Sequence, residues 1–291
     1  NNAESGLVIF LKYRPPYAWQ EMIDFLRLRM IPGIESACND HYHRLLCLPE
    51  GLGLVTVSNV PEKTSLKVKL ELEKLQDMPK AISMIRRVFD LGADPCVISD
   101  TLGKDSTFKP HITNRPGLRL PGSWDTLEIA TRAILGQQVS VKAATTLAKR
   151  LVERFGQQID GYQDLNRLFP AAETLAEADI ASLGMPQKRG NAIRAVARLV
   201  AGSPYLFQQD VDPEELHHSL MELPGIGPWT ASYVTMRAAH DTNRFLAGDL
   251  VVRKSYSQDK EQLVSARELE RISQGWSPWR AYAVMHLWAA A

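Results

Sequence analysis

The chain of 291 residues contains only three cysteines, Cys38, Cys47 and Cys96, and none of them belongs to a Cys-x-x-Cys pair. Protein iron–sulfur clusters need four thiolates, so this count excludes one. Isolated cysteines are typical of a reduced, cytosolic protein. The seven histidines also lack metal-ligand spacing, because His217 and His218 are adjacent rather than four apart. The sequence therefore predicts neither a cluster nor a side-chain metal site.

Long hydrophobic runs are also missing, since charges interrupt every apolar stretch well short of about 18 residues, which excludes a membrane span. The first residues, NNAESGLVIF, lack a basic stretch, a cleavage signature and a Met. We therefore expect these first residues to be an expression remnant, or the chain to be an excised piece of a longer one. The overall charge is balanced, with 34 Lys and Arg against 33 Asp and Glu, so it neither supports nor excludes a polyanionic partner.

The amino-terminal part alternates strand-like and helix-like patterns. Apolar or alternating runs predict strands at 6–13, 42–48, 52–60 and 65–75, and helical periodicity predicts helices at 18–31 and 78–92. Gly92 is expected to cap the second helix. Short links and this order predict an antiparallel sheet with helices on one face. No chemical motif is visible in this part.

Residues 102–122 are polar, rich in Pro and Gly, and aperiodic, which predicts a linker. Almost everything after it is helical, so we expect an α+β domain over 1–112 and a helical region over 113–291. The expected helices cover 125–136, 140–156, 170–184, 188–202, 212–223, 228–239, 249–256, 265–273 and 277–291. The expected amino-terminal caps are Asp125 with Glu128, Ser140, Ser265 with Glu268, and Ser277 followed by Pro278.

The stretch ELPGIGPWTASYVTMRAA at 222–239 places a four-residue Pro-Gly-Ile-Gly link between two predicted helices. So short a link makes the helices fold back as a helix–hairpin–helix. We expect both Gly225 and Gly227 to adopt positive φ and to leave backbone N–H groups uncovered. Those groups lie at a helix amino terminus, which favours an anion. A phosphate of a nucleic-acid backbone is the predicted guest.

Asp249, in FLAGDLVVRK, heads a predicted helix 22 residues after Gly227. An amino-terminal cap is one role for it. A second role is catalytic, because breaking an N-glycosidic bond builds positive charge on the sugar, and a fixed carboxylate stabilises that charge or orients water. The two roles are compatible.

These segments resemble the helix–hairpin–helix (HhH-GPD) DNA glycosylases, which carry a Gly/Pro-rich loop and a catalytic aspartate. YRPPYAWQEMIDFL and RPGLRLPGSWDTLEIATRAILGQQVS narrow the likeness to the bacterial 3-methyladenine-DNA glycosylase II (AlkA) family, over about residues 8–288. The resemblance implies that Asp249 is catalytic and that the hairpin grips DNA. It also implies a bound monovalent cation, Na⁺ or K⁺, held by the carbonyls of Met221, Leu223 and Ile226, with no cofactor required.

The resemblance further implies a pocket for an extruded base, since a base must leave the stack before chemistry occurs on it. Bases alkylated at N3 or N7 are cationic, and aromatic faces attract cations. The expected pocket residues are Trp229, Tyr233, Trp288 and Phe25, each with core packing as the alternative. The expected DNA-contacting residues are Gly225, Gly227, Thr230, Gln137 and Gln138.

The sequence departs from its relatives at four positions. Bifunctional members keep a lysine where this chain has Trp229, so we expect base release without strand cleavage. Gln138 replaces the leucine that fills the gap in the duplex, and Gly248 and Leu250 replace an acidic residue and a pocket tyrosine. A glutamine at position 138 can still fill the gap and hydrogen-bond to the orphaned partner base. The changes at Gly248 and Leu250 favour a different base preference.

The predicted function is therefore that of a glycosylase that acts on alkylated double-stranded DNA. We expect the protein to be monomeric, cytoplasmic and associated with the bacterial nucleoid, and not to bind a membrane. Two alternatives stay open. One is a non-catalytic helix–hairpin–helix module that only binds DNA. The other is a glycosylase of the same fold that removes oxidised purines.

Overall fold

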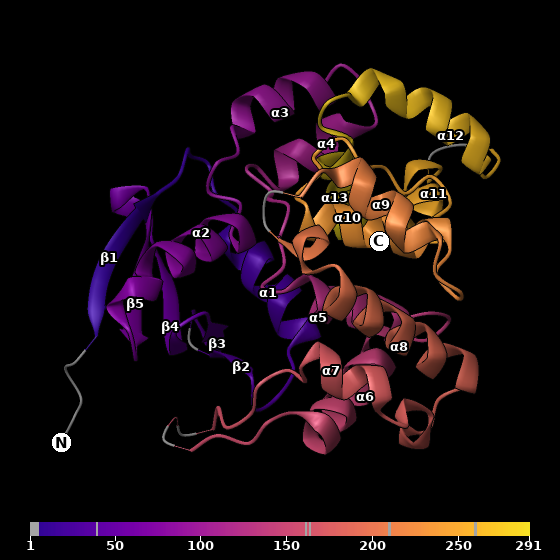
Figure 1. The fold of residues 1–291 in the computed structure, drawn as a ribbon. Helices are drawn as coiled ribbons and strands as arrows, with labels where there is room; N and C mark the ends of the chain where they lie inside the picture. The colour runs from indigo at the N-terminus through magenta and orange to yellow at the C-terminus, as the bar shows by residue number, and fades with distance from the viewer. Residues whose placement is uncertain (1–5, 39, 161, 163, 209–210, 259–260) are drawn as a thin grey trace.

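The computed structural model describes residues 6–38, 40–160, 162, 164–208, 211–258 and 261–291. Five strands form one antiparallel sheet in the order β1-β5-β4-β3-β2 (Figure 1). The strands are β1 (Leu7–Lys12), β2 (Glu35–Cys38), β3 (His41–Leu48), β4 (Gly51–Val60) and β5 (Ser65–Leu72). The predicted α+β class is confirmed. The sequence missed β2, which has only four residues, Glu-Ser-Ala-Cys, and no alternating apolar pattern.

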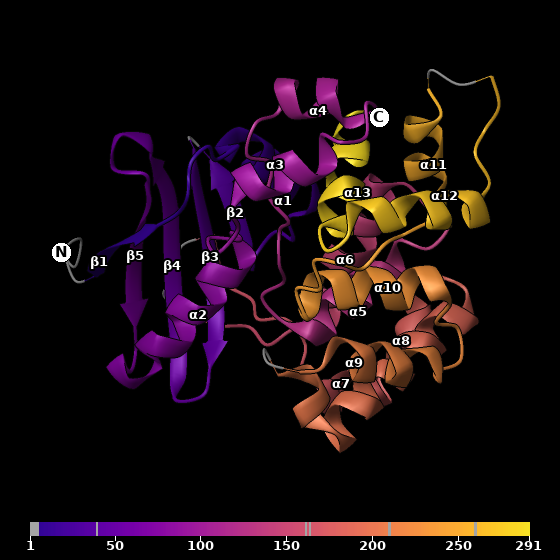
Figure 2. The ribbon, with the colours of Figure 1, turned by 90° about the horizontal axis from the view of Figure 1, so that it is seen from above.

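Helices α1 (Trp19–Arg29) and α2 (Met78–Val88) pack on one face of this sheet (Figure 2). Their apolar sides meet Val55 and Val57 of β4, which are fully buried. Gly92 does not cap α2, because that helix already ends at Val88 and Phe89 takes the cap position. On the opposite face, Leu45 of β3 packs against Ile159, Leu165 and Leu168, which belong to the loop after α6.

The predicted linker contains secondary structure. Helix α3 (Pro95–Leu102) precedes it and α4 (Phe108–Asn114) lies inside it. Phe108 is fully buried and meets the Trp276 ring edge-on, with 5.0 Å between the ring centroids. The short helix was invisible to periodicity because one large aromatic residue, not a repeating apolar stripe, anchors it.

The rest of the chain is helical, as expected, and its helices surround two apolar cores that share α10. The predicted caps Asp125, Ser140 and Ser265 are confirmed, since each side chain accepts a backbone N–H of its helix. Two boundaries were wrong: α7 ends at Glu177, and α13 begins at Arg280 rather than after Ser277. The helices are α5 (Thr126–Leu135), α6 (Val141–Phe155), α7 (Ala172–Glu177), α8 (Gln187–Gly202), α9 (Pro213–Met221), α10 (Pro228–Ala238), α11 (Leu250–Tyr256), α12 (Ala266–Ser273) and α13 (Arg280–Ala289).

None of the helices in the described ranges has both the length and the apolar composition that a membrane span requires.

His286 on α13 makes the stability of this helical part depend on pH. Its side chain is 4% exposed, and its Nδ1 has no hydrogen-bond partner among the described residues. Burial, together with the smaller effects of the nearby charges of His111 and Arg115, lowers the pKa of His286 to about 4. The imidazole of His286 therefore binds a proton near pH 6.5 in the unfolded chain but only near pH 4 in the folded chain.

We expect the free energy of unfolding to fall by about 3 kcal/mol as the pH drops from 6.5 to 4, because of this one group. His286→Leu should remove that part of the pH dependence in urea melts recorded across the window. His218→Gln is the control, since His218 is exposed on α9. An unchanged pH slope in His286→Leu would contradict the assignment.

Candidate active site

The link between α9 and α10 is a hairpin in which only one glycine needs its conformational freedom. Gly225 has φ +86°, the left-handed region that disfavours a side chain. Gly227 has φ −98° and ψ 173°, extended backbone that any residue adopts, so the expectation of positive φ at Gly227 was wrong. Ile226 between them is buried, and its N–H donates to the Leu223 carbonyl oxygen at 3.2 Å. The turn itself is confirmed, and its backbone geometry rests on Gly225.

We expect Gly225→Ala to weaken DNA binding about tenfold, since a left-handed alanine costs about 1–2 kcal/mol. The added Cβ would also lie 3.0 Å from the Ala192 Cβ, so that contact must give way. The loss should be equal for damaged and undamaged duplexes, because phosphate contacts carry no base information. Fluorescence anisotropy with both duplexes measures it.

The matched control is Gly227→Ala, whose Cβ would meet no atom within 4 Å. Its DNA affinity should stay close to that of the parent protein. An equal loss in both variants would mean that backbone cover, not hairpin geometry, governs binding.

Asp249 lies at the amino terminus of α11 and is 9% exposed. Its Oδ1 accepts the Val252 backbone N–H at 2.9 Å, so the predicted cap is confirmed. Its Oδ2 accepts the indole N–H of Trp229 at 2.8 Å. Both carboxylate oxygens are therefore fixed in direction, one by its own helix and one by the first turn of α10.

The four expected pocket residues and the expected catalytic residue, Asp249, line one cavity of about 440 Å³. The Trp229 ring is stacked on the Tyr233 ring, with 5.1 Å between the ring centroids and an angle of 8° between the planes. The centroids of the Tyr233 and Trp288 rings are 6.1 Å apart. Phe25 reaches the cavity from α1 in the amino-terminal part. Tertiary folding thus joins α1, α10, α11 and α13 at one hollow lined with aromatic rings.

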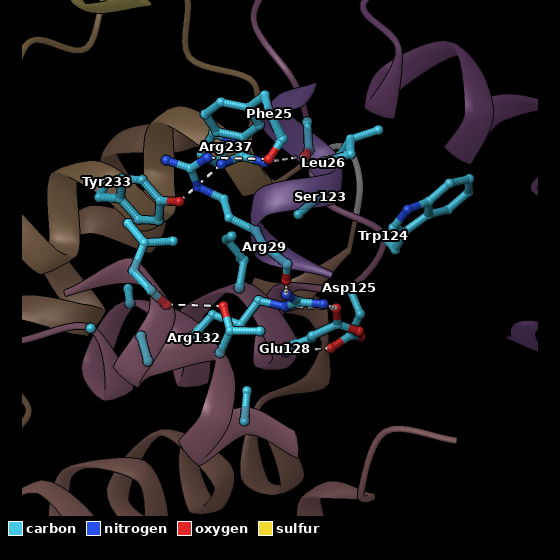
Figure 3. Close-up of a pocket in the computed structure, with 18 of the residues that line it drawn as sticks. Phe25, Leu26, Arg29, Ser123, Trp124, Asp125, Glu128, Arg132, Tyr233 and Arg237 are labelled. Atoms are coloured by element: carbon cyan, nitrogen blue, oxygen red, sulfur yellow. Dashed lines mark hydrogen bonds and ion pairs between the residues drawn. The ribbon is translucent and has the colours of Figure 1, made fainter. Parts of the chain in front are cut away.

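Four arginines line the cavity that were not expected from the sequence: Arg29, Arg44, Arg132 and Arg237. The guanidinium carbon of Arg29 lies 3.7 Å from the Phe25 ring centroid, and that of Arg237 lies 4.8 Å from the same centroid. Arg237 also donates to the Tyr233 hydroxyl at 2.9 Å (Figure 3). Burial raises the pKa of Tyr233, but the positive charges of Arg237, Arg29 and Arg132 outweigh it, so the pKa is lowered overall.

A buried ionic network forms part of the cavity wall and joins the sheet to α5. Arg44 on β3 binds Glu35 at 3.0 Å and also Glu128, while Arg132 binds Glu35 at 2.5 Å and Glu128 at 2.7 Å. Burial would raise the pKa of Glu35, but Arg132, Arg44 and the Tyr42 hydroxyl together lower it to about 2. The two carboxylates and two guanidinium groups compensate one another.

Glu128 shows why this network escaped sequence analysis. The sequence indicated a capping pair, and the Glu128 N–H does donate to Asp125 Oδ1 at 2.8 Å. Its carboxylate, however, is drawn to Arg44 and Arg132. One signal was available: Glu128 and Arg132 are four apart and are the only charged residues of α5, a helix that is otherwise apolar except for two threonines.

The remaining expected DNA contacts lie around the hairpin. Gln138 is exposed with φ +58°, and Thr230 is buried with its hydroxyl accepting from Gln137 at 3.1 Å. Met221 ends α9 and is exposed, whereas Leu223 is half-buried. Among the residues that the structure describes, no three His, Cys, Asp or Glu side chains gather in a way that could hold a metal ion.

Two family profiles match the chain. Residues 8–125 match a family described as the AlkA N-terminal domain, and residues 131–278 match the HhH-GPD superfamily base excision DNA repair protein. The chain is 31% identical to the DNA-3-methyladenine glycosylase 2 of Escherichia coli, over 96% of this chain and 95% of that protein.

A second relative is the probable bifunctional transcriptional activator/DNA repair enzyme AlkA of Mycobacterium tuberculosis, with 36% identity over 98% of this chain. The chain spans only 58% of that protein's length. Among solved structures, the 3-methyladenine DNA-glycosylase of Archaeoglobus fulgidus has a TM-score of 0.82 and 22% identity, with 97% of both chains covered, which shows a shared fold. The chain therefore belongs to the HhH-GPD superfamily of base excision DNA repair proteins and carries the AlkA type of amino-terminal domain.

Proposed function

We propose that this protein is a monofunctional DNA glycosylase that extrudes alkylated purines from duplex DNA and hydrolyses their N-glycosidic bond. One observation carries the proposal: the buried carboxylate of Asp249 lines the same aromatic cavity as Trp229, Tyr233 and Trp288. The hairpin that would bind the DNA backbone leads directly into the helix that carries Trp229. The E. coli relative, named a DNA-3-methyladenine glycosylase, supports the assignment over nearly the full length of both chains.

The geometry supports a simple division of work. The aromatic walls receive the extruded base, and the departing base draws electrons from the sugar, so that positive charge develops at C1′ and the ring oxygen. Asp249, held by Trp229 and by its own helix, offers a fixed negative charge to that sugar. A water molecule then adds at C1′ and loses a proton, which leaves an abasic site and an intact strand.

The preference for cationic bases rests on fewer aromatic faces than the sequence suggested. Phe25 and Tyr233 already have guanidinium groups over their rings, with Arg237 lying 5.6 Å from the Tyr233 centroid. Trp229 and Trp288 carry no such cation among the described contacts, so we assign the preference for 3-methyladenine and 7-methylguanine to them. A cation–π contact contributes about 0.5–2 kcal/mol, so the preference is modest.

The direct test is to incubate the protein with DNA treated with a methylating agent and to identify the released bases by chromatography. Release of 3-methyladenine and 7-methylguanine is the expected result. DNA that contains oxidised purines is tested in parallel. Release of oxidised purines in preference to methylated ones would establish the alternative of a glycosylase that acts on oxidised bases. Binding without release of any base would establish the non-catalytic DNA-binding alternative instead.

We expect base release without strand cleavage. An imine with the sugar requires an amine near C1′, and no lysine occurs among the described residues that line the cavity. Trp229 occupies the position at which bifunctional relatives carry that lysine. Borohydride added during turnover should therefore trap no covalent protein–DNA adduct on a denaturing gel. Trapping as efficient as that of a bifunctional glycosylase run alongside would refute this expectation.

The same proposal sets our expectations for the oligomeric state, the location and the bound ion of the protein. With genomic DNA as substrate, we expect the protein to act as a monomer at the bacterial nucleoid, in the cytoplasm. The backbone carbonyls of Met221, Leu223 and Ile226 belong to one turn, and carbonyl oxygens suit hard cations. A Na⁺ or K⁺ ion held there would draw a DNA phosphate to the hairpin, and no other cofactor is expected.

A further inference from the structure

The loop between α5 and α6, residues 136–140, is fastened to the hairpin by the side chain of Gln137. Its Nε2 donates to the Gly225 carbonyl oxygen at 3.1 Å and to the Thr230 hydroxyl oxygen at 3.1 Å. A primary amide has two N–H donors, so both are used on the hairpin. The loop and the hairpin are 88 residues apart along the chain at this contact, so only tertiary folding brings them together.

A second fastening comes from α8. The Nη2 of Arg189, in the first turn of that helix, donates to the Gln137 carbonyl oxygen at 2.5 Å. Charged donors make the stronger hydrogen bonds. The hairpin also lies close to this helix, since a Cβ on Gly225 would be 3.0 Å from the Ala192 Cβ. The loop, the hairpin and α8 thus meet at one junction centred on Gln137.

The residue next to this junction is held in an unfavourable conformation. Gln138 has φ +58°, which costs a residue with a Cβ atom free energy and persists only where its surroundings enforce it. Its side chain is exposed, and Gly136 and Val139 on either side line the cavity. Gln138 therefore stands at the rim of the cavity, where a duplex would have a gap after losing a base from its stack.

We propose that Gln137 and Arg189 are positioning residues that lock the Gln138 loop to the phosphate-binding hairpin as one rigid unit. When the hairpin grips the backbone, Gln138 is then already placed to enter the gap left by the extruded base. The proposal rests on the proposed base-release function. It assigns Gln137 a role inside the protein rather than a direct contact with DNA, because its amide donors are used.

The test compares one lesion in two duplexes, with 7-methylguanine opposite cytosine or opposite a mismatched thymine. A mismatched base leaves the stack more easily, so its release depends less on a well-placed Gln138. In Gln137→Met, single-turnover release from the well-paired duplex should fall about tenfold, roughly the effect of the lost hydrogen bonds. Release from the mismatched duplex should fall no more than about threefold.

The control is Gln157→Met, an exposed glutamine in the loop after α6, which should leave both rates unchanged. Arg189→Met gives a second, independent break of the junction and decides the question if Gln137→Met does not fold. Equal losses on both duplexes, or no loss on either, would overturn the positioning role. No base release by the unmutated protein from either duplex would instead refute the proposed function, so the two failures are distinct.

Discussion

Asp249→Asn is expected to lower the single-turnover rate of base release by about 100-fold or more, because removing a preorganised electrostatic group at a reacting centre has that effect. Asparagine keeps the helix cap, since its amide oxygen can accept the Val252 N–H as the carboxylate does. It cannot neutralise charge on the sugar. The folded state and DNA binding should therefore survive while chemistry is lost.

The measurement is release of 7-methylguanine from a defined duplex, with affinity for a duplex containing an abasic-site analogue measured in parallel. Trp229→Phe is the informative companion, because it keeps a smaller aromatic ring and removes the indole donor at 2.8 Å from Asp249 Oδ2. We expect its loss to be smaller than that of Asp249→Asn. A nearly unchanged release rate in Asp249→Asn would refute the catalytic assignment.

Glu128→Gln is expected to lower the free energy of unfolding by about 3–5 kcal/mol, because it leaves buried positive charge without a partner. Glu128 is 4% exposed and accepts from Arg132 Nε at 2.9 Å and from Arg44 Nη1 at 3.2 Å. Without its charge, Arg44 and Arg132 face Glu35 alone. Since β3 and α5 are joined by this network, the contact between the sheet and the helical region should loosen first.

Urea denaturation at neutral pH measures this effect as a shift of the midpoint. Glu153→Gln is the matched control, because Glu153 forms an exposed pair with Lys149 on α6, with 3.6 Å between the charged groups. Exposed pairs contribute little, so its midpoint should stay in place. A shift in Glu128→Gln no larger than in the control would mean that solvent reaches the network and screens it.

Local chemistry explains which parts of the fold were predictable. Asp125, Ser140 and Ser265 cap helices through contacts within three residues, so the sequence alone indicates them. The strand β2 and the helices α3 and α4 were missed, because all three are short and β2 and α4 depend on partners elsewhere in the chain. The cis peptide bond between Ser277 and Pro278 belongs to a turn before α13, where the sequence had indicated a helix start.

In the candidate site, too, some features were predictable from the sequence and others depend on the tertiary structure. The sequence itself determined the hairpin, the carboxylate at Asp249 and the absence of a lysine at Trp229, because each depends on residue type and short spacing. Only the tertiary structure decided that Arg29, Arg237 and the Glu35–Arg44–Glu128–Arg132 network surround the aromatic cavity, and that Gln137 binds the hairpin. Burying a charge requires a partner of opposite charge or a hydrogen-bond acceptor. Here such partners are up to 116 residues away, as for Arg237 and the Pro121 carbonyl oxygen, and no local pattern records that distance.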